Sequence, residues 1–375
     1  GSVVHVLDAS RSVPVAGSLL SQEKEVFVQS VKEEYAKMRE HYSKHKDAKS
    51  YVSLPEARKN KFPIDWNENN VVTPKNLGVT VFENIDLSIL VNYIDWTPFF
   101  QTWELAGKFP KILEDEIVGS EAKKLYADAT EMLSKIIAEK WISAKAVIGL
   151  FPANSINDDD IEIYADEERK KVIAINHNLR QQTKKAQGAY NMCLADFIAP
   201  KERGIRDYIG AFVVTAGIGI EKWIKKFEQE HDDYSSILLK ALADRLAEAL
   251  AEYMHEQVRK KYWGYATNEH LDNESLIKEK YQGIRPAPGY PACPDHTEKI
   301  TLFNLLEAEK NTGVQLTESL AMYPAASVSG WYFANPQSQY FGIGKIEKDQ
   351  LADIAKRKNI SLDEMERWLS PVLIY

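Results

Sequence analysis

The segment Gly283–Pro294 (GIRPAPGYPACP) restricts the fold of this chain more than any other part of the sequence. Four of the chain's 15 prolines fall between Pro286 and Pro294. Each proline fixes its own φ and removes a backbone donor, so the segment can form neither a helix nor an interior strand. The sequence therefore predicts a rigid, extended loop.

Arg285 stands at the entrance of this loop. A stiff loop lowers the entropy cost of holding a side chain against a ligand, and the planar guanidinium of arginine can grip a carboxylate with two hydrogen bonds. Two interpretations stay open at this level. Arg285 is either a carboxylate anchor or a surface arginine on a proline-rich connector.

The predicted elements mix helices with antiparallel-looking strands. Because no regular β-α-β alternation occurs, the pattern favours an α+β fold over a doubly wound sheet. Strands are predicted at Val79–Ile85, Ala146–Phe151, Ile161–Tyr164 and Gly210–Ile218, helical segments at Ile89–Ile94 and Lys123–Ala138, and a hairpin-like unit at Ser329–Phe341.

The clearest helix is predicted for Tyr234–Trp263, with Ser235 or Ser236 as its N-cap. A leucine stripe at i,i+4 spacing gives it an apolar face. Like charges at this spacing cost about 0.2–0.5 kcal/mol per pair in an isolated helix, so a second, acidic stripe is unusual. Either this acidic face is solvated, or one or two of its carboxylates face a cationic ligand or partner. The stripe consists of Asp244, Glu248 and Glu252.

One acid lies within the aromatic segment Tyr93–Phe100 (YIDWTPFF). A buried carboxylate without a partner is costly, so Asp95 needs a donor or a cation nearby. It either caps a helix that begins near Trp96 or binds a cationic group.

Composition excludes several classes of protein. With 47 Lys and Arg against 55 Asp and Glu, the net charge is −8, which is unsuited to general nucleic-acid binding. The longest apolar run, near Ala211–Ile220, is about half of the roughly 20 residues that a membrane helix needs. Two cysteines, Cys193 and Cys293, exclude a disulfide scaffold and fit a reducing cytoplasm. No metal-ligand spacing or nucleophile elbow occurs, so neither a metal nor a catalytic residue is predicted.

The N-terminal part differs from the main body, which we expect to span residues 62–375. Val3–Leu7 is predicted to be a strand whose neighbours are missing. Residues 1–20 are therefore interpreted as the tail of a preceding domain, with Gly1-Ser2 as a cloning remnant. Residues 21–61 are interpreted as a linker, in which an exposed helix from Lys24 becomes extended near Pro55.

Five segments together closely resemble the C-terminal activation domain of cobalamin-dependent methionine synthase. The resemblance runs from about Phe62 to Tyr375, and its proline loop is very specific. Residues 3–20 resemble the final strand and helix of a preceding cobalamin-binding domain. The resemblance implies an α+β domain with a twisted antiparallel sheet and flanking helices. The five segments are Tyr93–Gly107, Asp233–Glu252, Gly283–Lys299, Thr317–Phe333 and Lys356–Trp368.

The resemblance also implies a function. In this family the domain binds S-adenosylmethionine (AdoMet), whose methyl group rescues inactive cob(II)alamin as methylcobalamin once a flavodoxin-type donor has given one electron. We expect cobalamin on a neighbouring domain of the same polypeptide, because the cobalamin-ligating Asp-x-His-x-x-Gly pattern is absent from this sequence. The chain alone is not expected to make methionine, and its expected location is the cytoplasm.

Five side chains are assigned to AdoMet by the resemblance. Arg285 would grip the ligand's carboxylate, and Asp95 would pair with its ammonium group. Tyr340 and Phe341 match the family's aromatic pair, and Glu248 would offset the positive charges.

Further assignments concern the ligand's rings and the partners. The main chain of Ala287 and the ring of Tyr290 would support the adenine or ribose, and Asp244 would meet the cobalamin domain. Alternatives are a docking module for the cobalamin domain or flavodoxin whose ligand binding is vestigial, and an independent methyltransferase. Candidate basic patches for flavodoxin are Arg259–Lys261, Lys356–Lys358 and Lys201–Arg203.

Overall fold

The structure is a computed structural model that describes residues 4, 12–21, 24–46, 50–67 and 71–375. The chain divides into two compact units, 1–52 and 53–375. The first unit holds helices α1 (Ser12–Leu20) and α2 (Lys24–Lys46), and α2 confirms the predicted exposed helix. Except for Val4, the strand predicted at Val3–Leu7 lies outside the described residues.

The second unit begins at Ser53, before the expected start at Phe62. The extended linker predicted near Pro55 is wrong, because helix α3 (Leu54–Lys59) forms there. Ser53 and Glu56 make a capping box at its start, and a proline in the first helical turn loses no hydrogen bond.

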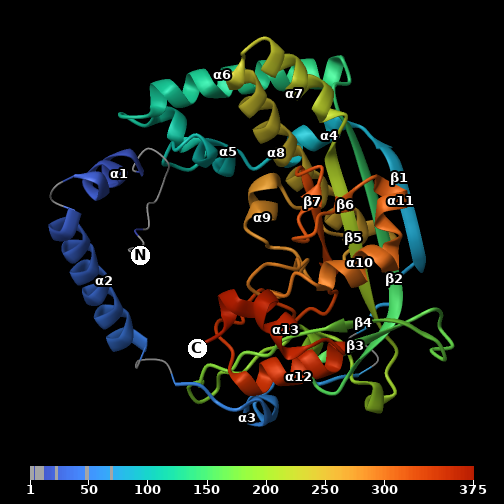
Figure 1. Ribbon diagram of the computed structural model, residues 1–375. Helices are drawn as coiled ribbons and strands as arrows, with labels where there is room; N and C mark the ends of the chain where they lie inside the picture. Colours follow the sequence, from blue (N-terminus) through green and yellow to red (C-terminus); the bar gives the residue numbers. More distant parts are fainter. Residues whose placement is uncertain (1–3, 5–11, 22–23, 47–49, 68–70) are drawn as a thin grey trace. The chain divides into compact units, whose positions relative to one another are not determined.

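An antiparallel sheet is the centre of the second unit (Figure 1). Six strands of the described chain form it, in the order β4-β3-β2-β5-β8, with β1 paired to the first part of β2. All these pairings are antiparallel, which confirms the predicted fold class. The strands are β1 (Gly78–Ile85), β2 (Ser143–Ile156), β3 (Asp160–Tyr164), β4 (Val172–His177), β5 (Asp207–Ile218) and β8 (Ser327–Tyr332); β6 (Gln315–Leu316) and β7 (Met322–Tyr323) form a separate pair.

Helices cover both faces of the sheet, so β2 and β5 are buried on both sides. Successive side chains of a strand point to opposite faces, and the two apolar cores follow this alternation. Ala146 and Ile148 belong to the core that includes α8 (Asp233–Gln257), whereas Val147 and Phe151 belong to the core that includes α10 (Glu298–Leu306). This double burial explains why the predicted strands were apolar runs.

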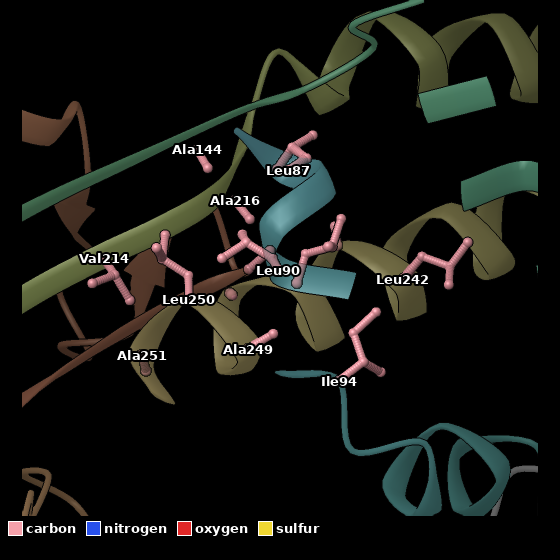
Figure 2. Packing of buried hydrophobic residues seen from close by; sticks show 14 of the residues in the cluster. Leu87, Leu90, Ile94, Ala144, Val214, Ala216, Leu242, Ala249, Leu250 and Ala251 are labelled. Carbon is pink, nitrogen blue, oxygen red and sulfur yellow. The ribbon is translucent and has the colours of Figure 1, made fainter. Parts of the chain in front are cut away.

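Helix α8 packs its apolar stripe against the sheet. Figure 2 shows Leu250 of α8 beside Val214 of β5, with Leu90 and Leu242 in the same core. The other helices are α4 (Leu87–Leu90), α5 (Thr97–Thr102), α6 (Gly119–Ala138), α7 (Ile220–Gln229), α9 (Asn273–Ile277), α11 (Ala308–Thr312), α12 (Lys348–Lys358) and α13 (Leu362–Leu369), with 3₁₀ turns between some of them.

Two local predictions need correction. The N-cap of α8 is Asp232, whose carboxylate accepts a hydrogen bond from the Ser235 N–H at 3.0 Å, and neither serine caps the helix. The hairpin predicted at Ser329–Phe341 does not form, because β8 pairs with β5 and the proline loop lies along its other side. After β8 the chain turns at Asn335, whose side chain accepts from the Gln337 N–H.

Candidate functional site

The proline loop is fixed to the end of strand β8. Ile284 and Phe333 exchange two backbone hydrogen bonds of 3.0 Å each, and the Trp331 N–H donates to the carbonyl of Pro286 at 2.9 Å. A Cβ at Gly330 would lie 2.8 Å from that carbonyl oxygen, so only glycine permits this close approach. The prolines are tolerated because the loop lies at the edge of the sheet, where no ladder hydrogen bond is required of them. The segment is a loop, as predicted, but it is extended only at its start, because two turns follow at Ala287–Tyr290 and Tyr290–Cys293.

Arg285 is held at both ends. Its backbone N–H donates to the Tyr340 hydroxyl at 2.9 Å, and its Nη1 atom donates to the Tyr281 hydroxyl at 2.8 Å and pairs with Glu252 Oε2 at 2.8 Å. Burial is the largest single effect and disfavours the charge on Arg285, but Glu252 together with Tyr281, Tyr340 and Glu248 outweighs it, so the pKa of the guanidinium is raised. Nε and Nη2 donate no hydrogen bond within the described part of the chain, so they are available to a ligand.

Two hollows adjoin at Arg285. Their volumes are about 460 and 350 Å³, and both are lined by Glu248, Glu279 and Arg285. The structure thus brings together all seven residues that the resemblance assigns to the ligand: Asp95, Glu248, Arg285, Ala287, Tyr290, Tyr340 and Phe341. Asp244 lines neither hollow, so its expected contact with the cobalamin domain stays a prediction.

The smaller hollow is strongly acidic. Its walls carry four carboxylates against two arginines, which favours a ligand with positive charge. Asp95 lies here at the start of α5, and its carboxylate accepts a hydrogen bond from the Thr97 N–H at 2.9 Å. Asp95 is not the N-cap of α5, because that position is Trp96, which has no side-chain cap hydrogen bond. It stabilises the chain entering α5 and still lines the hollow. The charged residues are Asp95, Arg245, Glu248, Glu252, Glu279 and Arg285.

The acidic stripe of α8 is divided between two environments. Glu252 is 7% exposed and pairs with Arg285, whereas Glu248 and Asp244 are exposed. Asp244 reaches solvent on one side but is surrounded by protein on the other, and this partial desolvation, together with the neighbouring Glu248, raises its pKa despite the opposing effect of Arg245. The stripe is therefore partly a solvated face and partly a wall of the site.

Sequence reasoning missed several residues beside Arg285. Glu279 reaches both hollows because a φ of 53° turns the chain just after α9. Tyr281 and His255 surround the guanidinium: the Tyr281 hydroxyl accepts its hydrogen bond, and His255 Nδ1 lies 3.4 Å from Nη1. No periodicity joins these positions to Arg285, so only the folded chain reveals the cluster.

Three cations from the candidate flavodoxin patches, each with a side chain at most 11% exposed, are engaged inside the molecule, and the more exposed Lys260 and Lys201 also pair with Glu256 and Glu162. Their charges are therefore largely neutralised, and they do not form free basic patches. Lys261, Lys356 and Arg203 are exposed and can still attract an acidic partner. The internal pairs are Arg259 with Glu269, Arg357 with Asp160 and Asp353, and Lys358 with Asp295 and Glu298.

His255 predicts a specific pH dependence of stability. Its side chain is fully buried, and burial followed by the charges of Arg259 and Arg285 lowers its pKa well below the ordinary value. Below about pH 6.5 the unfolded chain binds a proton that folded His255 does not. The free energy of unfolding should therefore fall on acidification, by up to about 1.4 kcal/mol per pH unit.

Urea unfolding between pH 5 and pH 8 measures this effect. The His255→Gln variant should lose that part of the dependence, whereas His231→Gln, at an exposed histidine, should keep it. Equal pH dependence in the parent and the His255→Gln variant would contradict the assignment.

The residues that the structure describes contain neither a metal site nor a membrane helix. Among the described residues, no group of three or more His, Cys, Asp or Glu is arranged to hold a metal ion. Cys193 and Cys293 are buried free thiols. No helix in the described part of the chain combines the length and apolar character needed to cross a membrane.

Comparisons with known proteins agree on one family. The family model described as vitamin B12 dependent methionine synthase, activation domain, matches residues 86–359. A solved structure described as the MetH reactivation domain bound to AdoHcy (S-adenosylhomocysteine) is 58% identical in sequence, with a TM-score of 0.84. That match covers 87% of this chain and 99% of the other, and it confirms the predicted fold class. The chain belongs to the activation-domain family of vitamin B12-dependent methionine synthase.

Proposed function

We propose that the two hollows around Arg285 bind AdoMet, and that the chain thereby supports the reductive remethylation of inactive cob(II)alamin. Cobalamin would be held by a neighbouring domain of the same polypeptide, and a flavodoxin-type donor would supply one electron. The observation that carries the proposal is the acidic hollow built around the partly available guanidinium of Arg285. The AdoHcy bound to the related reactivation domain supports the same ligand class.

The residues of the hollows fit the charges of AdoMet. The ligand has a sulfonium, an ammonium and a carboxylate, so its net charge is +1. Nε and Nη2 of Arg285 would receive the carboxylate as a charge-assisted pair, and Asp95 would accept from the ammonium group. Glu248 and Glu279, which line both hollows, would offset the sulfonium.

The larger hollow fits the adenosine part of the ligand. Its lining includes Ala287, Pro291, Phe341 and the exposed ring of Tyr290. Aromatic rings and proline faces offer flat apolar surfaces to adenine, while the rigid loop holds the surfaces in place without a further entropy cost.

The site would promote methyl transfer by holding AdoMet in the required orientation. AdoMet supplies an activated methyl group, and the acceptor is the reduced cobalt of cobalamin, which needs no deprotonation. Positioning by Arg285, Asp95 and the loop would direct the sulfonium methyl outward, toward the docked neighbouring domain. No general acid or base is therefore assigned in this chain.

Reductive methylation in trans tests the proposal. The chain would be mixed with the separate cobalamin-binding domain in its cob(II)alamin form, reduced flavodoxin and AdoMet. The visible spectrum should convert to that of methylcobalamin, at a rate that saturates with AdoMet. AdoHcy, which has no methyl group to give, is the matched control and should produce no conversion. A cob(II)alamin spectrum that persists at saturating AdoMet, or conversion that is equally fast without the chain, would contradict the proposal.

A further inference from the structure

Glu252 lies between two arginines at the back of the smaller hollow. Its Oε2 is 2.8 Å from Nη1 of Arg285, and its Oε1 is 3.8 Å from Nη1 of Arg259. The first contact is a close ion pair, whereas the second exceeds hydrogen-bond length. Within the described residues, both Glu252 Oε1 and Arg259 Nη1 are buried without a hydrogen-bond partner. In this structure Glu252 therefore pairs closely with Arg285 and leaves Nη1 of Arg259 without a partner.

Arg259 is fixed in place by contacts of its own. It lies on the π-helical turn Val258–Tyr262 that follows α8, and its side chain is fully buried. Nε and Nη2 donate to the carboxylate of Glu269 at 2.7–3.1 Å, and the guanidinium lies over the ring of Tyr281, 4.3 Å from its centre. Arg259 thus cannot move toward the ligand, but its Nη1 remains directed at Glu252.

A ligand carboxylate at Arg285 would meet competition from Glu252. Two anions would then share one guanidinium in a partly buried site, where like charges repel more strongly than in water. A small torsional movement of Glu252 toward Arg259 would close the 3.8 Å gap to a hydrogen bond. This movement would carry the negative charge of Glu252 away from the ligand's carboxylate and would give both buried, unpartnered atoms a partner.

We propose that Arg259 is a positioning residue that withdraws Glu252 from Arg285 and so makes the site selective for ligands that carry a carboxylate. Glu252 lies at the Nη1 side of Arg285 while the ligand is absent, and it shifts toward Arg259 when the ligand's carboxylate pairs with Nε and Nη2. Arg259 itself does not touch the ligand. This inference rests on the proposed AdoMet site and adds the basis of its selectivity.

Two ligands that differ only in the carboxylate test the inference. The dissociation constants of AdoMet and of decarboxylated AdoMet would be measured by calorimetry for the parent chain and the Arg259→Gln variant. AdoMet should bind the variant about 10- to 100-fold more weakly, because Glu252 then competes at Arg285. Decarboxylated AdoMet, which does not need Arg285, should change by less than about threefold.

A second variant keeps the test valid if Arg259→Gln does not fold. Glu252→Gln removes the competing charge, so it should raise the preference for AdoMet over decarboxylated AdoMet. The double variant Arg259→Gln/Glu252→Gln should regain most of the affinity for AdoMet. Equal losses for both ligands, or a lower preference in Glu252→Gln, would overturn the inference while leaving the proposed site intact. A folded parent that binds neither ligand would overturn the proposed function, and the inference with it.

Discussion

Replacement of Arg285 with alanine is expected to weaken AdoMet binding by about 2–5 kcal/mol, a loss of roughly 30-fold to 5000-fold. The reason is that Arg285 is the central cation of both hollows and that its Nε and Nη2 atoms are free to pair with a carboxylate. The substitution also leaves Glu252 without its close partner, which adds an uncompensated anion beside the ligand's carboxylate. Calorimetric titration of AdoMet into the parent and the variant measures the difference.

Two control variants separate this effect from general damage. Arg285→Lys keeps the positive charge but loses the planar fork, so its affinity should lie between those of the parent and Arg285→Ala. Arg203→Ala removes an exposed arginine away from the hollows and should leave the affinity unchanged. An Arg285→Ala variant that keeps the parent's melting temperature and affinity would show that the anchor lies elsewhere.

Replacement of Arg180 with alanine is expected to lower the free energy of unfolding by about 3–5 kcal/mol. Arg180 is fully buried, and its guanidinium donates to the carboxylates of Asp159 and Asp196 at 2.7–2.9 Å and to the backbone carbonyls of Asp158 and Asn191. These contacts tie the β2–β3 turn to the loop before β5. Without the guanidinium, two buried carboxylates lose their shared partner.

The midpoint of urea unfolding would measure this loss. Lys170→Ala is the matched control, because its pair with Glu168 is exposed on both sides and such pairs contribute little. A loss of less than about 1 kcal/mol for Arg180→Ala would show that the surrounding loops do not depend on this network.

The sequence alone predicts those elements in which neighbouring residues share the same burial or the same backbone constraint. β2 and β5 are covered on both faces, so their apolar runs are visible without knowledge of the fold. The proline loop was predicted for a comparable reason, since the constraint is a property of proline itself. In contrast, Pro55 was misinterpreted because proline is compatible both with a linker and with a first helical turn.

The chemistry of the site depends on pairings that sequence spacing does not show. The acidic stripe was recognised, but the burial of Glu252 follows from Arg285, which is distant in sequence and arrives on a loop fixed to β8. Arg259 was interpreted as part of a basic patch, yet it is enclosed by Glu269 and Tyr281. Arg180 stood in a polar segment without periodicity, so nothing marked it as the centre of a buried network.

The crystal structure of this chain grown with AdoMet would test the central claim most directly. The account predicts difference density for one AdoMet molecule across both hollows, with its carboxylate within hydrogen-bond distance of Arg285, its ammonium near Asp95 and its adenine beside Tyr290. AdoMet density at another place on the chain would contradict this account. So would the absence of ligand density from both hollows in crystals grown at a saturating AdoMet concentration.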